Sequence, residues 1–361
     1  MLLFAPAHPM RRFILPGAFV LLLFLTLFNR VPDPTADGDA LLSIGGQTMG
    51  TTFTIKVRTA VSDEKVKLIS DEALSVLQDI VAAMSTYEAQ SELMRWNGSR
   101  SVEPVAISSG LATVIGAGLD VHKASGGAFE MTVQPLVELW GFGPSRRSDP
   151  PRDEEIKNAL AIIGSQHLSF NAATSMLGKV KPELSIDLSA IAKGFAVDRV
   201  SERLTSLGYA DHFVEVGGEV RTSGYKGEKK PWRVGIEKPD QGGGVHVSLP
   251  LVNRSIATSG SYRNYRKFGD KMFSHTIDPR TGRPVTHKLV SVSVITEHCM
   301  YADAWATALA VLGPDEGYEV ADRQSLAAMF IFQNEKGDLV ERRTKTFISL
   351  SKADTVEPIS P

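Results

Sequence analysis

The order in which two hydrophobic periodicities occur along the chain constrains its fold most strongly. In the first half, apolar residues recur every three or four positions, which is typical of amphipathic helices. In the second half, short apolar or alternating runs follow one another with turn residues between them, which is typical of strands. Because this order differs from the regular alternation of a doubly wound sheet, the pattern predicts an α+β fold.

The same pattern places the expected elements. Residues 52–58 alternate like a half-buried strand, and Ser62 is a candidate N-cap for the helix that follows. Three helical stripes are expected: Val66, Ile69, Ala73, Leu77, Ile80 and Met84; then Leu111, Val114, Ile115, Leu119 and His122, ended by Gly126 and Gly127; then Val200, Leu204 and Leu207, closed by Gly208. The other expected elements are strands at 213–216, 232–236, 246–249, 272–277, 290–296 and 326–332, and a helix at 302–312.

The N-terminus carries an export signal. An uncharged apolar run, 13–28, follows Arg11 and Arg12 and precedes a polar, proline-bearing stretch. It is shorter than the ~20 residues that a straight helix needs to cross a bilayer, so a cleaved signal peptide and a retained signal anchor are both open. Ala36 and Gly38 suit a late cleavage site. Because no cysteine follows the run, lipid modification is excluded, and we expect a periplasmic protein with a possible inner-membrane tether through 13–28.

The 361 residues correspond to one large domain or two modest ones. We assign residues 1–40 to the export segment and a short linker, 41–351 to one domain and 352–361 to a C-terminal tail. The polar stretch 144–155 and the glycine run 242–244 are interpreted as loops within that domain.

Charge, cysteine content and missing motifs exclude several classes. Lys and Arg total 39 against 41 Asp and Glu, so no positive excess is available for nucleic acid. A single cysteine, Cys299, excludes an internal disulfide, a thiolate zinc cage and a redox CxxC pair. The sequence also lacks the standard Rossmann, P-loop, zincin and hydrolase-elbow patterns.

Clusters with ligand-binding potential occur early in the chain. Met49 precedes the first expected strand, and Tyr87 follows the first long helix, where its ring could face a pocket mouth. Residues 126–133 interleave glycines with Phe129, which lets the backbone approach a flat ring system. Ordinary capping, turns and core packing are the alternative interpretation of each.

Three further clusters point to phosphate and metal chemistry. Asp187 resembles a helix N-cap, and Lys193 near a helix N-terminus suits a phosphate. The hydroxyl residues and glycine of 257–260 can also bind phosphate. His275 ends an expected strand and is either structural or catalytic. Asp303 and Thr307 share a helix face and suit Mg²⁺, although such pairs also occur as caps or by chance.

Together these clusters resemble one family, the FAD:protein FMN transferases or ApbE family. The segments that carry the resemblance are, in order, MGTTFTIKV, MSTYEAQSELMRWN, GGAFEMTVQPLVELWGFGP, IDLSAIAKGFAVDRV, FVEVGGEV, IATSGSYRNY, SHTIDPRTGRPV and ADAWATALAVLG. They span 46 to about 332. The resemblance implies an α+β flavin-binding fold related to the T-fold architecture, and an exported Mg²⁺ enzyme that transfers FMN from FAD to a Thr or Ser of a redox flavoprotein. Some members instead hydrolyse FAD to FMN and AMP.

The resemblance also implies roles for individual residues. The residues expected on FAD are Met49, Tyr87, Ala128, Phe129, Glu130, Asp187, Lys193 and His275, to which we add Thr258, Ser259 and Gly260 for the phosphates. The metal would take the Ala190 carbonyl oxygen and the side chains of Asp303 and Thr307. Two departures stand out, because Glu130 replaces the family's usual aspartate and Ala306 stands where some relatives have a second carboxylate.

The chemistry expected of such a site sets the remaining roles. Attack on a diphosphate requires neutralised oxygens, which Mg²⁺ and Lys193 can supply, and a hydroxyl held in line with the leaving AMP. Our hypothesis makes His275 the general base, with Asp278 as the second candidate; His275 could instead only position FAD. An FAD pyrophosphatase and a flavin-binding protein without catalysis are the alternative functions.

Overall fold

The computed structural model describes residues 40–142, 147–239, 244–260, 265–268 and 271–353. The expected export segment, 13–28, lies outside these ranges, and the stretches 144–155 and 242–244 lie partly outside them. Within the described ranges, no helix combines the length and the apolar character needed to cross a membrane.

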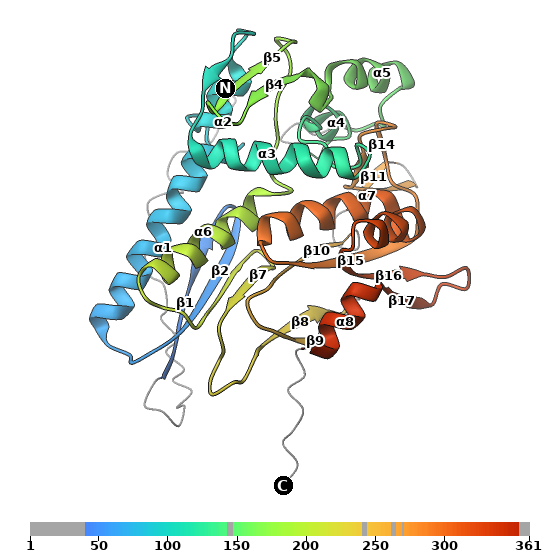
Figure 1. Ribbon diagram of the computed structural model, residues 1–361. Helices are drawn as coiled ribbons and strands as arrows, with labels where there is room; N and C mark the ends of the chain where they lie inside the picture. Colours follow the sequence, from blue (N-terminus) through green and yellow to red (C-terminus); the bar gives the residue numbers. More distant parts are fainter. Residues whose placement is uncertain (1–39, 143–146, 240–243, 261–264, 269–270, 354–361) are drawn as a thin grey trace, which may run out of the picture.

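A mixed fold with one large antiparallel sheet forms the body of the molecule (Figure 1). Neighbouring strands pair antiparallel throughout this sheet. In spatial order its strands are β1 (Ala40–Thr48), β2 (Thr51–Thr59), β6 (His212–Val216), β7 (Glu219–Ser223), β10 (Ser255–Gly260), β15 (Leu289–Thr296), β16 (Ala327–Gln333) and β17 (Leu339–Arg343). The N-terminal hairpin therefore joins the sheet through β6, far along the chain.

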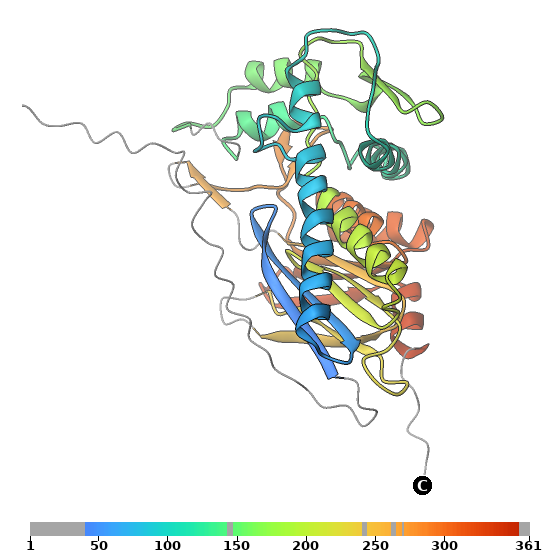
Figure 2. The same ribbon diagram turned by 90° about the vertical axis from the view of Figure 1, so that its left-hand side faces the viewer.

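Three helices cover one face of this sheet: α1 (Asp63–Met84), α6 (Ala192–Ser206) and α7 (Cys299–Arg323) (Figure 2). Side chains such as Ile55 and Val294 alternate toward these helices and form the main apolar cluster. The opposite face packs Val220 and Ile256 against the hairpin of β8 (Trp232–Glu237) and β9 (Val245–Leu251) and against α8 (Lys345–Ala353). The sheet is thus buried on both faces, which anchors its strands rigidly.

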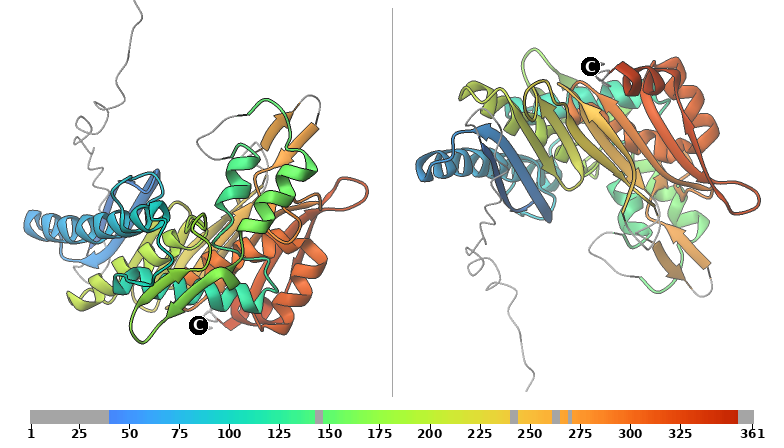
Figure 3. Two further views of the ribbon diagram at one scale, coloured as in Figure 1. Left: turned by 90° about the horizontal axis from the view of Figure 1, so that it is seen from above. Right: turned by 90° about the horizontal axis from the view of Figure 1, so that it is seen from below.

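Smaller elements gather at one end of the sheet, above α6 and α7 in Figure 1. They are α2 (Glu92–Gly98), β3 (Val105–Ala106), α3 (Ser109–Ala124), α4 (Gln134–Leu139), α5 (Asp153–Ile162), the 3-10 turn Ser165–His167, β4 (Leu168–Asn171) and β5 (Met176–Lys179). Two further hairpins lie beside α4 and α5, as Figure 3 shows: β11 (Tyr265–Phe268) with β12 (Lys271–Ser274), and β13 (Ile277–Asp278) with β14 (Arg283–Pro284). Trp140 ties these parts together, since its indole N–H donates to the carbonyl of Gly282 at 2.8 Å.

Several expectations from the sequence are confirmed. The Ser62 hydroxyl accepts a hydrogen bond from the Lys65 amide and caps α1. The apolar stripe of α1 is buried against the main cluster or packed on it. Gly126, Gly127 and Gly208 follow α3 and α6 with positive φ angles, as C-terminal residues of helices do.

Other expectations are wrong. Asp187 is not a helix N-cap, because α6 begins only at Ala192 and the Asp187 carboxylate accepts instead from the Ser189 amide at 2.7 Å. The expected strand 272–277 is two short strands, β12 and β13, and His275 lies in the break between them. The helix expected at 302–312 starts at Cys299 and continues past a kink at Gly313 and Pro314.

Four strands of the central sheet, β1, β7, β10 and β17, were not anticipated. β1 contains Gly45 and Gly46, β7 and β17 carry charged side chains, and β10 ends in the hydroxyl residues and glycine that we expected to bind phosphate. Their local sequences favour strand weakly, but each has strand partners already in place in the sheet. Tertiary pairing therefore overrides local propensity here.

Candidate active site

Three charged side chains meet where α6, α7 and β7 converge. The Lys193 ammonium lies 3.4 Å from Oε1 of Glu219 and 3.5 Å from Oδ1 of Asp303. The two carboxylates are almost fully buried, whereas about a quarter of the Lys193 side chain is exposed. Lys193 also donates a long hydrogen bond of 3.4 Å to the carbonyl of Ser189. One ammonium group thus faces two buried carboxyl groups.

The pKa shifts in this cluster follow from burial and charge. Burial alone would lower the pKa of Lys193, but the negative charges of Asp303 and Glu219 outweigh it and raise that pKa above its usual value. Burial raises the pKa of Glu219 to about 8, although the Lys193 charge opposes the rise. The cluster therefore carries a permanent ammonium at neutral pH and one carboxyl group held near its titration point.

Glu219 is a functional candidate that the sequence reasoning missed. Its Oε2 atom is buried and, among the described residues, has no hydrogen-bond partner. A buried oxygen without a partner is costly and marks a place where a ligand can supply the missing interaction. The available signal was a glutamate directly after the pair Gly217 and Gly218 in the segment FVEVGGEV.

Gly217 lies between Lys193 and the first residue of β2, Thr51. Gly217, with a φ of 61°, donates its N–H to the carbonyl of Thr52, and a Cβ there would come within 3.2 Å of the Lys193 side chain. Met49, in the turn between β1 and β2, is half-buried and packs on the main cluster. A glycine at 217 thus leaves room for the side chains of Thr51, two residues after Met49, and of Lys193.

The two proposed metal-ligating side chains lie on one face of α7. Asp303 is buried and accepts a hydrogen bond of 3.0 Å from the Gly194 amide. Thr307, one turn further on, is half-buried, and its hydroxyl lies 3.3 Å from that of Ser259 on β10. The Ala190 turn immediately precedes α6, whose second residue is Lys193. The expected metal ligands and phosphate residues thus belong to connected elements around one cluster.

This donor set suits a hard divalent cation. Within the described ranges, no three His, Cys, Asp or Glu side chains assemble into a metal cage. An aspartate, a hydroxyl and a backbone carbonyl are oxygen donors, and Mg²⁺ commonly completes such a partial set with water or substrate oxygens. The Glu219 oxygen that has no hydrogen-bond partner among the described residues is one more oxygen donor beside Lys193.

The segment around Glu130 lies deeper in the fold. Ala128, Phe129 and Glu130 are all buried. The Glu130 carboxylate accepts hydrogen bonds from the backbone and side chains of Thr132 and Ser165, at 2.7 to 2.9 Å. The glutamate side chain, one methylene longer than an aspartate, therefore places its carboxylate in hydrogen bonds within the protein, to Thr132 and Ser165. The same segment joins the Asp187 turn, because the Asp187 amide donates to the Met131 carbonyl at 2.7 Å.

The two candidate bases lie together beyond β12 but differ in their partners. His275 is half-buried, with its ring in an edge contact to Phe142 at a centroid distance of 6.4 Å. Asp278 binds Arg280 through both carboxylate oxygens, and Arg280 also binds Glu316 at 2.7 Å. Because both Asp278 oxygens are already bonded to Arg280, His275 is the stronger candidate base.

Tyr87 and Thr258 are the expected FAD residues that remain most exposed. Tyr87 is 88 % exposed beyond the C-terminus of α1. Thr258 lies on β10, where its hydroxyl bonds that of Ser293 at 2.7 Å, and Gly260 ends the strand half-buried. A single exposed aromatic side chain is ordinary in a folded protein, so the assignment of Tyr87 to FAD depends on the family resemblance and not on its exposure.

Two hollows occur away from this cluster. One, of about 300 Å³, lies beside α2 and Lys179; the other, of about 370 Å³, lies between α6 and β7 beside Arg221. Lys179 donates to three backbone carbonyls, at 3.0 to 3.3 Å, so its ammonium is already fully engaged. Neither hollow includes Lys193, Glu219 or Asp303, and we assign no site to either.

Comparisons with known proteins show the family to which the chain belongs. A model of the ApbE family matches residues 49–330. A Vibrio cholerae protein named FAD:protein FMN transferase is 41 % identical over 297 residues, covering 81 % of this chain and 88 % of the relative. A Haemophilus influenzae protein of the same name is 38 % identical over 323 residues, covering 86 % and 92 %. The solved structure of the flavin transferase ApbE from Vibrio cholerae has a TM-score of 0.78 at 38 % identity, covering 86 % of this chain and 99 % of that one.

Proposed function

The chain belongs to the ApbE family and is a transferase, and from this premise we propose that it moves the FMN part of FAD onto a partner redox flavoprotein. The acceptor atom is a threonine or serine hydroxyl oxygen. A bond forms between this oxygen and the FMN phosphorus, the bond from that phosphorus to AMP breaks, and AMP leaves. The hydroxyl proton passes to a base on the enzyme.

The single observation that supports this proposal is the Lys193 ammonium held between buried Asp303 and Glu219 at the start of α6. A helix N-terminus with an adjacent ammonium favours phosphate oxygens. Lys193 would bind and orient the diphosphate of FAD, and Asp303, Thr307 and the Ala190 carbonyl would hold Mg²⁺. When bound, Mg²⁺ supplies positive charge that offsets the charge developing on the diphosphate oxygens.

His275 is the proposed general base, because a histidine changes charge near neutral pH and its competitor Asp278 is tied to Arg280. Met49, Tyr87, Ala128, Phe129, Glu130 and Asp187 are the proposed contacts to the flavin nucleotide. For Glu130 the contact would run through its backbone, since its carboxylate bonds Thr132 and Ser165. Thr258, Ser259 and Gly260 would bind phosphate from β10.

We further propose that the protein acts outside the cytoplasm. The apolar run 13–28 after two arginines supports export, and retention of that run would tether the enzyme to the inner membrane. Detection of the full-length or the shortened chain in membrane and periplasmic fractions distinguishes an anchor from a cleaved signal.

Incubation with FAD and Mg²⁺, with and without an acceptor flavoprotein, tests the function. Covalent flavin fluorescence on the acceptor after denaturing electrophoresis is the expected result. Release of FMN and AMP without any labelled acceptor would replace the transferase with an FAD pyrophosphatase. Unchanged FAD under both conditions would reduce the protein to a flavin carrier.

A further inference from the structure

The N-termini of α6 and α7 cap each other. On α6, the Gly194 amide donates to Oδ2 of Asp303 at 3.0 Å. On α7, the Cys299 and Met300 amides donate to the two oxygens of Asp198, each at 2.9 Å. The first amides of a helix have no partner within the helix, so each helix here obtains its acceptor from an aspartate of the other.

The residues at the N-cap positions of α6 and α7 do not cap these helices with their own side chains. The N-cap position of α6 is Ile191, whose apolar side chain cannot accept a hydrogen bond. The N-cap position of α7 is His298, whose ring nitrogen Nδ1 lies 3.2 Å from an Arg221 nitrogen. The capping acceptors therefore come from residues about one hundred positions away in the sequence.

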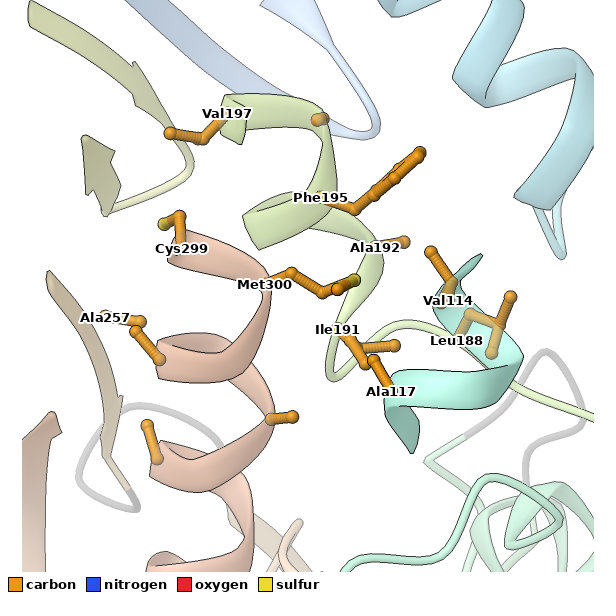
Figure 4. Packing of buried hydrophobic residues seen from close by; sticks show 14 of the residues in the cluster. Val114, Ala117, Leu188, Ile191, Ala192, Phe195, Val197, Ala257, Cys299 and Met300 are labelled. Carbon is orange, nitrogen blue, oxygen red and sulfur yellow. The ribbon is translucent and has the colours of Figure 1, made fainter. Parts of the chain in front are cut away.

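The two helices approach closely at this point. A Cβ at Gly194 would lie 2.4 Å from the carbonyl oxygen of Cys299. Figure 4 shows Cys299 and Met300 at the start of α7 beside Phe195 and Val197 of α6. Cys299 is therefore held on both sides, with its amide on Asp198 and its carbonyl against the Gly194 backbone.

β7 holds two of the charged residues of α6, Lys193 and Asp198. Residues two apart on a strand point to the same face, and Glu219 and Arg221 both contact α6. Glu219 pairs with Lys193, and Arg221 forms an ion pair with Asp198, which is almost fully buried. Val220 between them points to the opposite face and joins the second apolar cluster. Arg221 on β7 therefore holds the Asp198 carboxylate in the position from which it caps α7.

We propose that Asp198 is a positioning residue for the cation site, and this inference rests on the proposed function. Asp198 holds the first turn of α7 against α6. Asp303 and Thr307 lie one and two turns beyond Cys299 on the same face of the helix, so the placement of that first turn decides where their oxygens point. Asp198 itself touches neither the cation nor FAD.

Removal of the Asp198 carboxylate leaves two amides at the buried start of α7 without acceptors and releases Arg221. The Asp303 amide follows Cys299 by one helical turn, so disorder or displacement of that turn moves the Asp303 carboxylate. Loss of a group that orients a metal ligand typically lowers metal affinity by about 10- to 100-fold. We expect Asp198→Ala to bind a divalent cation at least about tenfold more weakly and Asp198→Asn, which keeps one acceptor oxygen, to fall between it and wild type.

The test measures Mn²⁺ binding to the full chain in detergent, from the electron paramagnetic resonance signal of unbound Mn²⁺ in the presence of FAD. Asp211→Asn is the matched control, because Asp211 also pairs with an arginine, Arg58, at 3.2 Å and accepts a backbone hydrogen bond, from Tyr225 at 2.8 Å. Melting temperatures of all variants separate general destabilisation from loss of the site. Asp303→Ala is measured in parallel.

The proposal requires weaker Mn²⁺ binding in both Asp198 variants than in wild type. The Mn²⁺ affinity of Asp211→Asn should stay within about twofold of wild type, even where its melting temperature falls as much as that of the Asp198 variants. Wild-type affinity in both Asp198 variants, or equal weakening in Asp211→Asn, overturns it. Should Asp198→Ala fail to fold, Asp198→Asn alone decides. If Asp303→Ala binds Mn²⁺ like wild type, the metal assignment in the proposed function fails instead, so the two failures are distinguishable.

Discussion

The backbone amide of Gly194 donates a hydrogen bond of 3.0 Å to Oδ2 of Asp303, at a point where α6 and α7 approach each other closely. The other carboxylate oxygen of Asp303 faces Lys193 at 3.5 Å. One side chain therefore joins two helices and contributes charge to the candidate active site. Stability and cation binding are coupled at this residue, and the coupling leads to the first two predictions.

Gly194→Ala should destabilise the protein by about 1 to 3 kcal/mol, the usual cost of overpacking. The added Cβ would meet the Cys299 carbonyl oxygen at 2.4 Å, and backbone atoms cannot rotate away. Chemical denaturation measures the change. Gly98→Ala is the control, since a Cβ there meets nothing within 4 Å. A Gly194→Ala protein as stable as the control variant would contradict the close contact.

Asp303→Ala should abolish Mg²⁺-dependent flavin transfer, because it removes the carboxylate assigned to the cation. It should also lower the melting temperature, since the Gly194 amide loses its acceptor. Asp303→Asn keeps that acceptor and should recover much of the stability but not the activity. Activity is followed as flavin fluorescence on the acceptor. Undiminished transfer by Asp303→Ala would remove the metal assignment.

His275→Gly should lower the rate of transfer by on the order of 10²-fold or more if His275 is the general base. FAD affinity, measured by fluorescence titration, should stay close to wild type. A parallel loss of FAD binding would make His275 a binding residue instead. Asp278→Asn serves as the comparison, because Arg280 already occupies that carboxylate; a larger loss of rate there would transfer the role of base to Asp278.

His212 should make stability depend on acidity. Its ring is fully buried on β6, with Nδ1 2.8 Å from the Tyr209 carbonyl oxygen and Nε2 2.7 Å from the Ser201 hydroxyl, and burial lowers its pKa to about 4. The unfolded chain binds a proton near pH 6.5, so the unfolded state takes up more protons between pH 6.5 and 4. The free energy of unfolding should therefore fall by up to about 3 kcal/mol as pH drops through this window, and stay constant with respect to His212 above it.

Urea denaturation at pH 7, 6 and 5 measures this effect. His212→Gln should reduce the slope of stability against pH, whatever its effect at pH 7. His246→Gln is the control, because His246 is exposed to solvent beside Glu341. An unchanged slope in His212→Gln would show that other groups carry the acid sensitivity.

Much of the fold could be predicted because it depends on neighbours within a few positions. The spacing of Ile69, Ala73 and Leu77 predicted α1, and Ser62 caps it through the amide three residues later. Glycines that end helices were equally visible, since a positive φ is a local requirement. The motifs that carry Asp303, Thr307 and Lys193 were also recognisable, because each is a short continuous segment.

The rest depends on residues that meet only after the chain has folded. Glu219 is a candidate site residue because β7 brings it to Lys193. Asp198 is a positioning residue because it accepts a hydrogen bond from Cys299, which starts α7 and lies 101 positions further along the chain. Asp187 was misread for the same reason, since the caps of α6 and α7 come from distant aspartates. β10 was missed because its hydroxyl residues become a strand only between β7 and β15.

Short-range periodicity and capping need no distant partner, so the helices with strong amphipathic stripes, their glycine ends and the family motifs follow from the order of residues alone. Folding then fixes which charges meet, which aspartate caps which helix and which carboxylate oxygen has no hydrogen-bond partner among the described residues. Those outcomes depend on close packing between α6, α7 and β7, and the hydrogen-bond energy of buried polar groups is set by the neighbours that packing supplies.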